Sequence, residues 1–283
     1  MAVVSGQHES ATRGGITPQS DSGPRSLQRR LLRATANGVL IVAVYGACIG
    51  AWQLLVEALQ VPKYILPAPS EVAVALWTVF ANEGLARDLY ATLVEMLAGL
   101  AIATVSAVIA AALIEEFPIV RRLVYPALVV LQSIPKMAVA PLIMIWIGLG
   151  IESKITLAAL VAFFPLLVNS MSGFAGYDRD ALDLFKSLHA GRFETFVRLK
   201  LRAFLPSFFA GLKVGYMFAL LGAIVGEFLG SDAGLGHAIV QMQFQLNVAG
   251  VFAVLVVLAV IGFVGERLVA LAEWRWTRWR GRT

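Results

Sequence analysis

The sequence predicts an all-α membrane protein with six transmembrane helices, and three observations support this fold class. Of the 283 residues, 59% are hydrophobic and only 14% are charged, whereas a water-soluble domain carries about 25% charged residues. The mean hydropathy is +0.78. Six apolar stretches have roughly the 20 residues with which a helix crosses a hydrocarbon core of about 30 Å. A water-soluble enzyme is therefore excluded.

The expected spans cover approximately residues 34–56, 91–114, 124–149, 155–177, 204–228 and 246–265. The first is too long for a signal-peptide core and follows a long polar segment, so it is expected to remain as an anchor. Pro126, Pro135 and Pro141 cannot all lie in one straight helix. We therefore expect the third span to consist of an interfacial piece followed by a short spanning helix. After Leu66-Pro67-Ala68-Pro69, Ser70 and Glu71 indicate a helix start, which predicts an external helix over about 70–80.

The basic residues predict the orientation in the membrane. With alternating spans, 18 of the 23 Lys and Arg residues lie on the side of the N-terminus, and only Lys63, Arg87 and Lys154 lie on the other. The positive-inside rule then places both termini in the cytoplasm. Residues 1–33 are expected to form a disordered cytoplasmic tail, 34–273 the membrane domain, and 274–283 a basic cytoplasmic tail. The net charge of +5 reflects this topology and does not indicate nucleic-acid binding.

No motif for covalent chemistry is present. The sequence contains no phosphate-binding loop, no metal-ligand spacing and no nucleophile motif, and its three histidines are far apart. The single cysteine, Cys48, lies in an apolar run. We therefore expect no catalytic residue, no metal site and no cofactor bound by this chain, and any ATPase must be another polypeptide.

The interior loop 178–206 is patterned. Leu184, Phe185, Leu188, Phe193 and Phe196 recur at helical spacing among charged residues, which predicts two short helices broken near 190–191. Two readings remain open: an amphipathic loop lying on headgroups, or a helix that presents aromatic anchors to a cytoplasmic partner.

Polar and small residues inside the spans suggest further sites. Small residues recur every four positions from Gly211 to Gly226, and this stripe either packs the bundle or lines a path against a second copy. Lys213 is expected to reach the cytoplasmic headgroups, and Glu95 and Glu227 to be wetted near the outer ends. Lys136 follows a helix break, where a cation would favour an anionic solute. The candidates for a translocation path are Lys136, Gly222, Gly226 and Glu227.

The loop residues Asp183 to Phe193, together with Leu205-Pro206, resemble the EAA loop of binding-protein-dependent ABC importer permeases. Asp183 stands for the glutamate of that pattern, Leu184 and Phe185 for its two alanines, and His189 for its glycine. Residues 132–150 and 222–236 resemble signature stretches of the nitrate, sulfonate and taurine branch, as does the segment before the external helix.

The resemblance implies a type I (MetI-like) permease in a bacterial cytoplasmic (inner) membrane. It implies a homodimer, two cytoplasmic ATPase subunits that use ATP and Mg, and a periplasmic or lipid-anchored solute-binding protein. The expected cargo is a small anion such as a sulfonate, nitrate, taurine or a related organic acid. The alternative is an ion-gradient-driven secondary transporter. The ATPase-coupling residues would be Asp183, Leu188, Gly191, Arg192, Phe193, Thr195, Phe196, Val197 and Pro206.

Overall fold

The computed structural model describes residues 24–81 and 83–278, with no side chains for 24–38, 83, 118 and 192. Contacts within the chain divide it into two units, residues 1–55 and 56–283, and each is described by itself. Helix α1 (Pro24–Ala58) makes up the described part of the first unit. It begins ten residues before the expected span, so residues 24–33 of the expected disordered tail are helical. Proline is tolerated at a first helical position. Residues 1–23 and 279–283, which hold most of the expected tails, lie outside the described part.

The described residues form helices and no strand. Five helical segments are long and apolar enough to cross a membrane: Val39–Ala58, Gly84–Glu116, Ile151–Ala175, Phe193–Leu229 and Val248–Trp276. A sixth candidate is a pair of helices bent by 80°. The expected fold class is confirmed.

The bent pair corrects the expected form of the third span. Helix α4 (Pro118–Ser133) tolerates Pro126 in its interior and ends before Pro135. The 3-10 turn η1 (Lys136–Val139) and helix α5 (Ala140–Ile147) follow. Eight α-helical residues extend about 12 Å. Because the hydrocarbon core is about 30 Å thick, α5 cannot be the short spanning helix that the sequence suggested.

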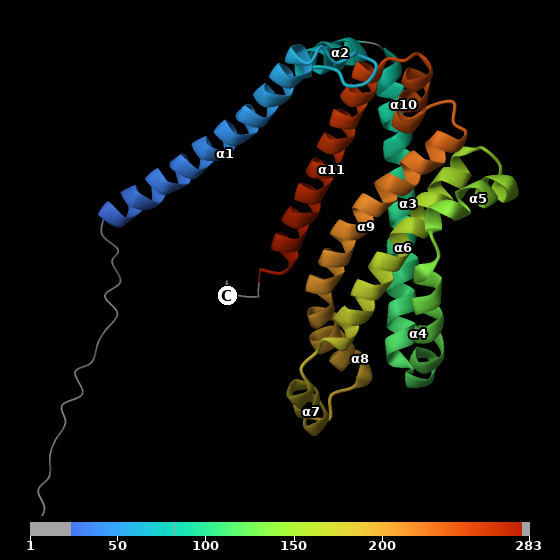
Figure 1. Ribbon diagram of the computed structural model, residues 1–283. Coiled ribbons are helices and arrows are strands. Elements are labelled where there is room, and N and C mark those ends of the chain that lie inside the picture. Colours follow the sequence, from blue (N-terminus) through green and yellow to red (C-terminus); the bar gives the residue numbers. More distant parts are fainter. Residues whose placement is uncertain (1–23, 82, 279–283) are drawn as a thin grey trace, which may run out of the picture. The chain divides into compact units, whose positions relative to one another are not determined.

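Three long helices form the centre of the second unit. Helix α6 (Ile151–Ala175) packs against both α3 (Glu83–Glu116) and α9 (Leu201–Leu229), more extensively than any other pair of described elements (Figure 1). Small residues allow this approach: Ala158 of α6 is fully buried, and Gly99 of α3 and Gly222 of α9 both face it.

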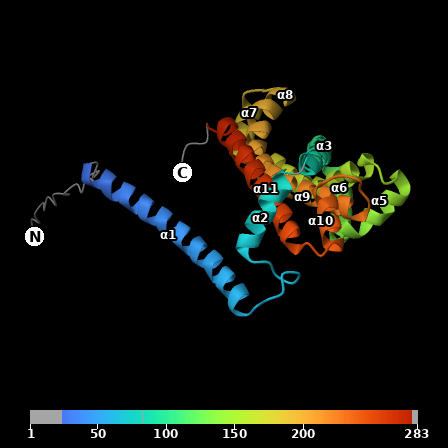
Figure 2. The ribbon, with the colours of Figure 1, turned by 90° about the horizontal axis from the view of Figure 1, so that it is seen from above.

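The remaining helices lie at the two ends and along one side of this centre. Figure 1 shows α7 (Arg179–Ser187) and α8 (Arg192–Thr195) at one end, and α10 (Leu235–Phe244) at the opposite end. Helix α11 (Val248–Trp276) packs against α9, α10 and α2 (Pro69–Ala81) (Figure 2). Helix α2 coincides with the helix expected over 70–80. Its Glu71 pairs with Lys63 at 2.5 Å, and this ammonium holds the pKa of the Glu71 carboxyl below its usual value.

An ion pair joins α9 to α11. Lys213 Nζ lies 2.5 Å from Glu273 Oε2, and both side chains are about 30% exposed. The structure thus gives Lys213 a partner within the chain, and its expected reach to the cytoplasmic headgroups stays a prediction. A carboxylate on the neighbouring helix neutralises the ammonium, which is how charges within spans are commonly accommodated.

Candidate functional site

The loop 178–206 begins as predicted, with a short amphipathic helix. The Asp178 carboxylate caps α7 by accepting a bond of 3.0 Å from the Asp180 N–H. Asp183 pairs with Lys186 at 2.8 Å on the exposed surface of α7. Leu184 and Leu188 are exposed apolar residues of the same segment.

The break after α7 is centred on His189. Its φ is +54°, in the left-handed region that glycine adopts most readily. This is the position at which the EAA pattern has a glycine, so the conformation explains that preference. Gly191 has no such requirement, because it does not lie in the left-handed region, and an added Cβ would meet nothing within 4 Å.

The second expected helix of the loop is not separate from the next span. Helix α8 continues through the π-helical turn η2 (Phe196–Lys200) into α9. The helical segment 193–229 is therefore uninterrupted, with Pro206 in the second turn of α9. Because proline withholds one backbone donor and π turns widen the helix, any bend in this segment is expected near its beginning.

The predicted coupling residues in this segment divide between two surfaces. Phe193 is 82% exposed, and Val197 is also exposed. Phe196 instead stacks on Phe174 of α6, with ring centroids 5.9 Å apart. Thr195 donates to the Gly191 carbonyl within its own turn, at 3.1 Å. The Arg192 side chain lies outside the described part. Phe193 is thus free to contact a partner, while Phe196 anchors the segment to the bundle.

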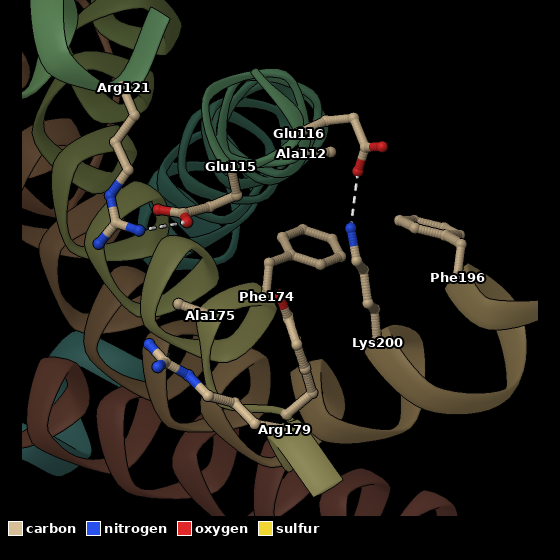
Figure 3. A pocket seen from close by; sticks show the side chains of 10 residues that line it. Ala112, Glu115, Glu116, Arg121, Phe174, Ala175, Arg179, Phe196 and Lys200 are labelled. Atoms are coloured by element: carbon tan, nitrogen blue, oxygen red, sulfur yellow. Dashed lines mark hydrogen bonds and ion pairs between the residues drawn. The ribbon is translucent and has the colours of Figure 1, made fainter. Parts of the chain in front are cut away.

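A cavity of about 270 Å³ lies where this segment meets the ends of α3 and α6 (Figure 3). Lys200 Nζ bonds Glu116 Oε2 at 2.7 Å, which ties η2 to the last turn of α3. Arg121 of α4 bonds Glu115 at 3.1 Å beside it. Movement of the 193–200 segment would therefore be transmitted directly to α3 and α6.

Glu227, a predicted path residue, is buried at the opposite end of the bundle. It is 1% exposed and accepts a bond of 2.6 Å from the Thr92 hydroxyl of α3. Lys154 lies in the same cluster, with its Nζ 3.6 Å from Glu95 Oε1. Lys154 was expected on the external side just before the fourth span, and it lies instead within α6 with its side chain buried. The expectation that Glu95 and Glu227 are wetted is wrong, because both are buried. The clue in the sequence was that two acidic residues within spans need a nearby cation.

Gly222 and Gly226 face α6 of their own chain. A Cβ at Gly222 would lie 2.7 Å from the Ala158 Cα, and one at Gly226 would lie 3.1 Å from the Lys154 Cγ. This placement favours the alternative in which the small stripe packs the bundle. It gives no support to the alternative of a stripe lining the path, and a path role for these glycines stays a prediction.

Lys136 lies at the bend between α4 and α5. Its Nζ donates to the Gln132 carbonyl at 3.0 Å and lies 4.7 Å from the centre of the Phe164 ring. By contrast, Lys154, Lys200 and Lys213 each have a carboxylate partner. Within the described residues, the structure gives Lys136 no such partner.

These features define a multi-pass helical membrane protein with an exposed aromatic loop at one end and buried charge at the other. Residues 103–278 match the family described as "Binding-protein-dependent transport system inner membrane component". The chain belongs to this family, and the resemblance to ABC importer permeases is confirmed.

Curated relatives cover most of the chain. It is 34% identical to the formylaminopyrimidine transport permease protein ThiX of Halalkalibacterium halodurans, over 81% of this chain and 91% of the relative. It is 32% identical to the riboflavin transport system permease protein RibX of Chloroflexus aurantiacus, over 81% of this chain and 85% of the relative. It is 26% identical to the putative aliphatic sulfonates transport permease protein SsuC of Escherichia coli, over 82% of this chain and 88% of the relative.

The comparisons establish a membrane transport component and leave its cargo open. Family membership implies an ATPase and a solute-binding protein as partners. The relatives are named for chemically different solutes, so the sulfonate and nitrate assignment is not specifically confirmed.

Proposed function

We propose that this chain is the membrane-spanning subunit of an ABC importer in a bacterial inner membrane. Two copies form the path, two cytoplasmic ATPase subunits that use ATP and Mg drive it, and a solute-binding protein delivers a small anion. Both termini and the 178–206 loop face the cytoplasm. The distribution of basic residues supports this orientation.

The observation that carries the proposal is the exposed Phe193 at the start of the continuous helical segment 193–229. A large aromatic side chain that is 82% exposed on a short helix is suited to fill a pocket on a partner. Since the same helix continues through the bundle, displacement of Phe193 by the ATPase would move a span directly. Family membership favours this ATP-driven arrangement over the ion-gradient-driven alternative.

Co-purification tests the docking site. Wild type and Phe193→Asp are solubilised from their native membrane, and co-purifying proteins are identified. The matched control is Phe244→Asp, because Phe244 is 86% exposed at the opposite end of the bundle. We expect a Walker-motif ATPase with wild type and Phe244→Asp but not with Phe193→Asp. An ATPase recovered equally with all three would remove Phe193 as the anchor, and none with any of them would contradict the importer.

Lys136 supports an anionic cargo. Its ammonium lies at the bend of the broken span and has no carboxylate partner in the part of the chain that the structure describes. A partly desolvated cation of this kind attracts anions. Helix breaks are also where transporters place polar backbone groups toward a solute.

Uptake by the reconstituted complex tests this role. Each variant is compared with wild type for uptake of a sulfonate and of an uncharged analogue of similar size. Lys136→Gln is expected to lose the preference for the anion, and Lys136→Arg to keep it. Unchanged selectivity in Lys136→Gln, at normal membrane insertion, would exclude Lys136 from the recognition of charge.

A further inference from the structure

The start of α10 is capped by side chains of other helices. Its N-cap residue is Gly234, with φ +118° and no capping side chain of its own. The first N–H groups of a helix have no partner within that helix. Here three successive N–H groups, of Gly234, Leu235 and Gly236, donate to Asp88 Oδ1 (2.9 Å), Thr92 Oγ1 (2.9 Å) and Glu227 Oε2 (2.5 Å). The side chains of α3 and α9 thus provide the oxygen atoms that would otherwise come from a local cap or from water.

A buried polar network lies directly beneath this cap. The Thr92 hydroxyl both accepts from the Leu235 N–H and donates to Glu227. Lys154 Nζ donates to Ser231 Oγ at 2.6 Å, on the segment that leads into α10, and lies 3.6 Å from Glu95. Glu95 Oε2 is buried and has no hydrogen-bond partner in the described structure. Two carboxylates, Glu95 and Glu227, thus lie in a network with one ammonium, which pairs with Glu95, and the network is only partly satisfied.

The three spans beneath the network are held at backbone contact. A Cβ at Gly99 of α3 would lie 2.6 Å from the Ala158 Cβ, and one at Gly222 of α9 would lie 2.7 Å from the Ala158 Cα. Ala158 is thus enclosed between both neighbours of α6. Separation of the spans at this level would open a dry small-residue interface. By contrast, the loop 230–234 carries no large apolar side chain and is attached through polar bonds, and apolar attachment begins with the fully buried Leu235. Water can replace polar bonds at a small net cost. The part free to move at this end is therefore the loop 230–234, which leads into α10.

We propose that Asp88, Thr92 and Glu227 form a latch that holds the start of α10 against α3 and α9 and opens once in each transport cycle. This inference rests on the proposed importer function. Lys154 is a positioning residue: it holds Ser231 and balances the charge of the carboxylates, so that Glu227 stays aimed at the Gly236 N–H. Opening frees the loop that leads into α10 while α3, α6 and α9 stay packed.

Hydrogen exchange measured by mass spectrometry tests the opening. The complex with its ATPase subunits is reconstituted in lipid, and the amides of 234–236 are compared at rest and after trapping with ATP and vanadate. We expect about tenfold faster exchange in the trapped state, which corresponds to the loss of about one buried hydrogen bond. Equal protection in both states would make the cap a static structural feature and overturn the proposal.

Thr92 offers an isosteric variant and a conservative rescue. Thr92→Val removes the hydroxyl while it keeps the volume, Thr92→Ser keeps the hydroxyl, and Ser106→Ala removes a hydroxyl that bonds only within α3. We expect Thr92→Val to increase ATP hydrolysis without solute several-fold relative to transport, and Thr92→Ser and Ser106→Ala to resemble wild type. A merely structural role for Thr92 would lower hydrolysis and transport together, and that result would overturn the latch.

The latch and the importer can fail separately. Exchange at Leu235 in Thr92→Val needs no ATPase, so the permease alone in detergent suffices for that measurement. Faster exchange than in wild type supports the latch contact even if no ATPase co-purifies. Unchanged exchange removes the latch and leaves the proposed function intact.

Discussion

Replacement of Gly222 by alanine tests how closely α6 and α9 are packed. The added Cβ would lie 2.7 Å from the Ala158 Cα and 3.0 Å from the Leu157 carbonyl oxygen. Both are backbone atoms, so no side-chain rotation relieves the contact. Since carbon atoms are in favourable contact at about 3.5–4.0 Å, the helices would have to separate by about 1 Å. Separation also weakens the contacts of the neighbouring small residues.

Two opposing terms set the magnitude of this effect. Alanine is favoured over glycine in a helix by about 1 kcal/mol, whereas overpacking of a close interface costs about 1–3 kcal/mol. The net loss expected for Gly222→Ala is therefore up to about 2 kcal/mol. At Gly226 the added Cβ would meet the flexible Lys154 side chain at 3.1 Å, so a smaller loss is expected. At the exposed Gly84 the added Cβ would meet nothing within 4 Å, so only the gain from the higher helix propensity of alanine remains.

The unfolding temperature of each variant is measured in detergent, with size-exclusion chromatography used to detect the protein that remains folded after heating. We expect the unfolding temperature to decrease in the order Gly84→Ala, wild type, Gly226→Ala and Gly222→Ala. A Gly222→Ala protein that unfolds at or above the temperature of Gly84→Ala would refute backbone contact between α6 and α9. It would also reopen the reading in which this glycine stripe faces a path.

Three further changes test individual features. His189→Gly relieves a left-handed conformation that costs other residues about 1–2 kcal/mol, so the amides of 186–190 should exchange more slowly, and faster exchange would contradict the strain. Lys213→Met leaves Glu273 without its partner and should lower the unfolding temperature; adding Glu273→Gln should restore most of the loss, whereas additive losses would exclude coupling. Because Lys63 lowers the pKa of Glu71, this pair should stabilise the fold above the ordinary carboxyl pKa of about 4 and lose that effect as the pH falls through the lowered value. Lys63→Met should reduce this acid dependence of the unfolding temperature, and an identical pH profile would rule out the pair as its source.

The sequence was sufficient for features that depend on local composition. The lengths of the apolar stretches located the spans, because a helix must match the thickness of the hydrocarbon core whatever it packs against. Pro69 with Glu71 located α2, since both suit a first helical turn. The pattern of aromatic residues located the amphipathic loop, although it could not show that α8 continues into α9. That continuity depends on the π turn at 196–200, for which the sequence carries no recognised signal.

Features that depend on pairing between residues far apart in the sequence could not be predicted from it. Thr92 bonds Glu227 across 135 positions, and Lys154 bonds Ser231 across 77. The hydropathy pattern places Lys154 at the end of a loop, because this residue directly precedes an apolar stretch. In the structure, Glu95 compensates its charge, so α6 begins four residues before the expected span and carries Lys154 into the bundle. An ionisable residue at the edge of a span is therefore placed by its partner and not by its hydropathy.

The segment 193–229 connects the two candidate sites. Phe193 lies at its first residue and Glu227 close to its last, about 50 Å apart along a helix that rises 1.5 Å per residue. Beyond Pro206 the helix has no internal proline, and its small residues fix it to α6. A displacement at Phe193 that is not absorbed near Pro206 therefore reaches Glu227, which accepts a hydrogen bond from the Gly236 N–H at the start of α10. A stiffer start of the segment should strengthen this coupling, so substitutions in the π turn or at Pro206 should change how much of the ATPase movement reaches the latch.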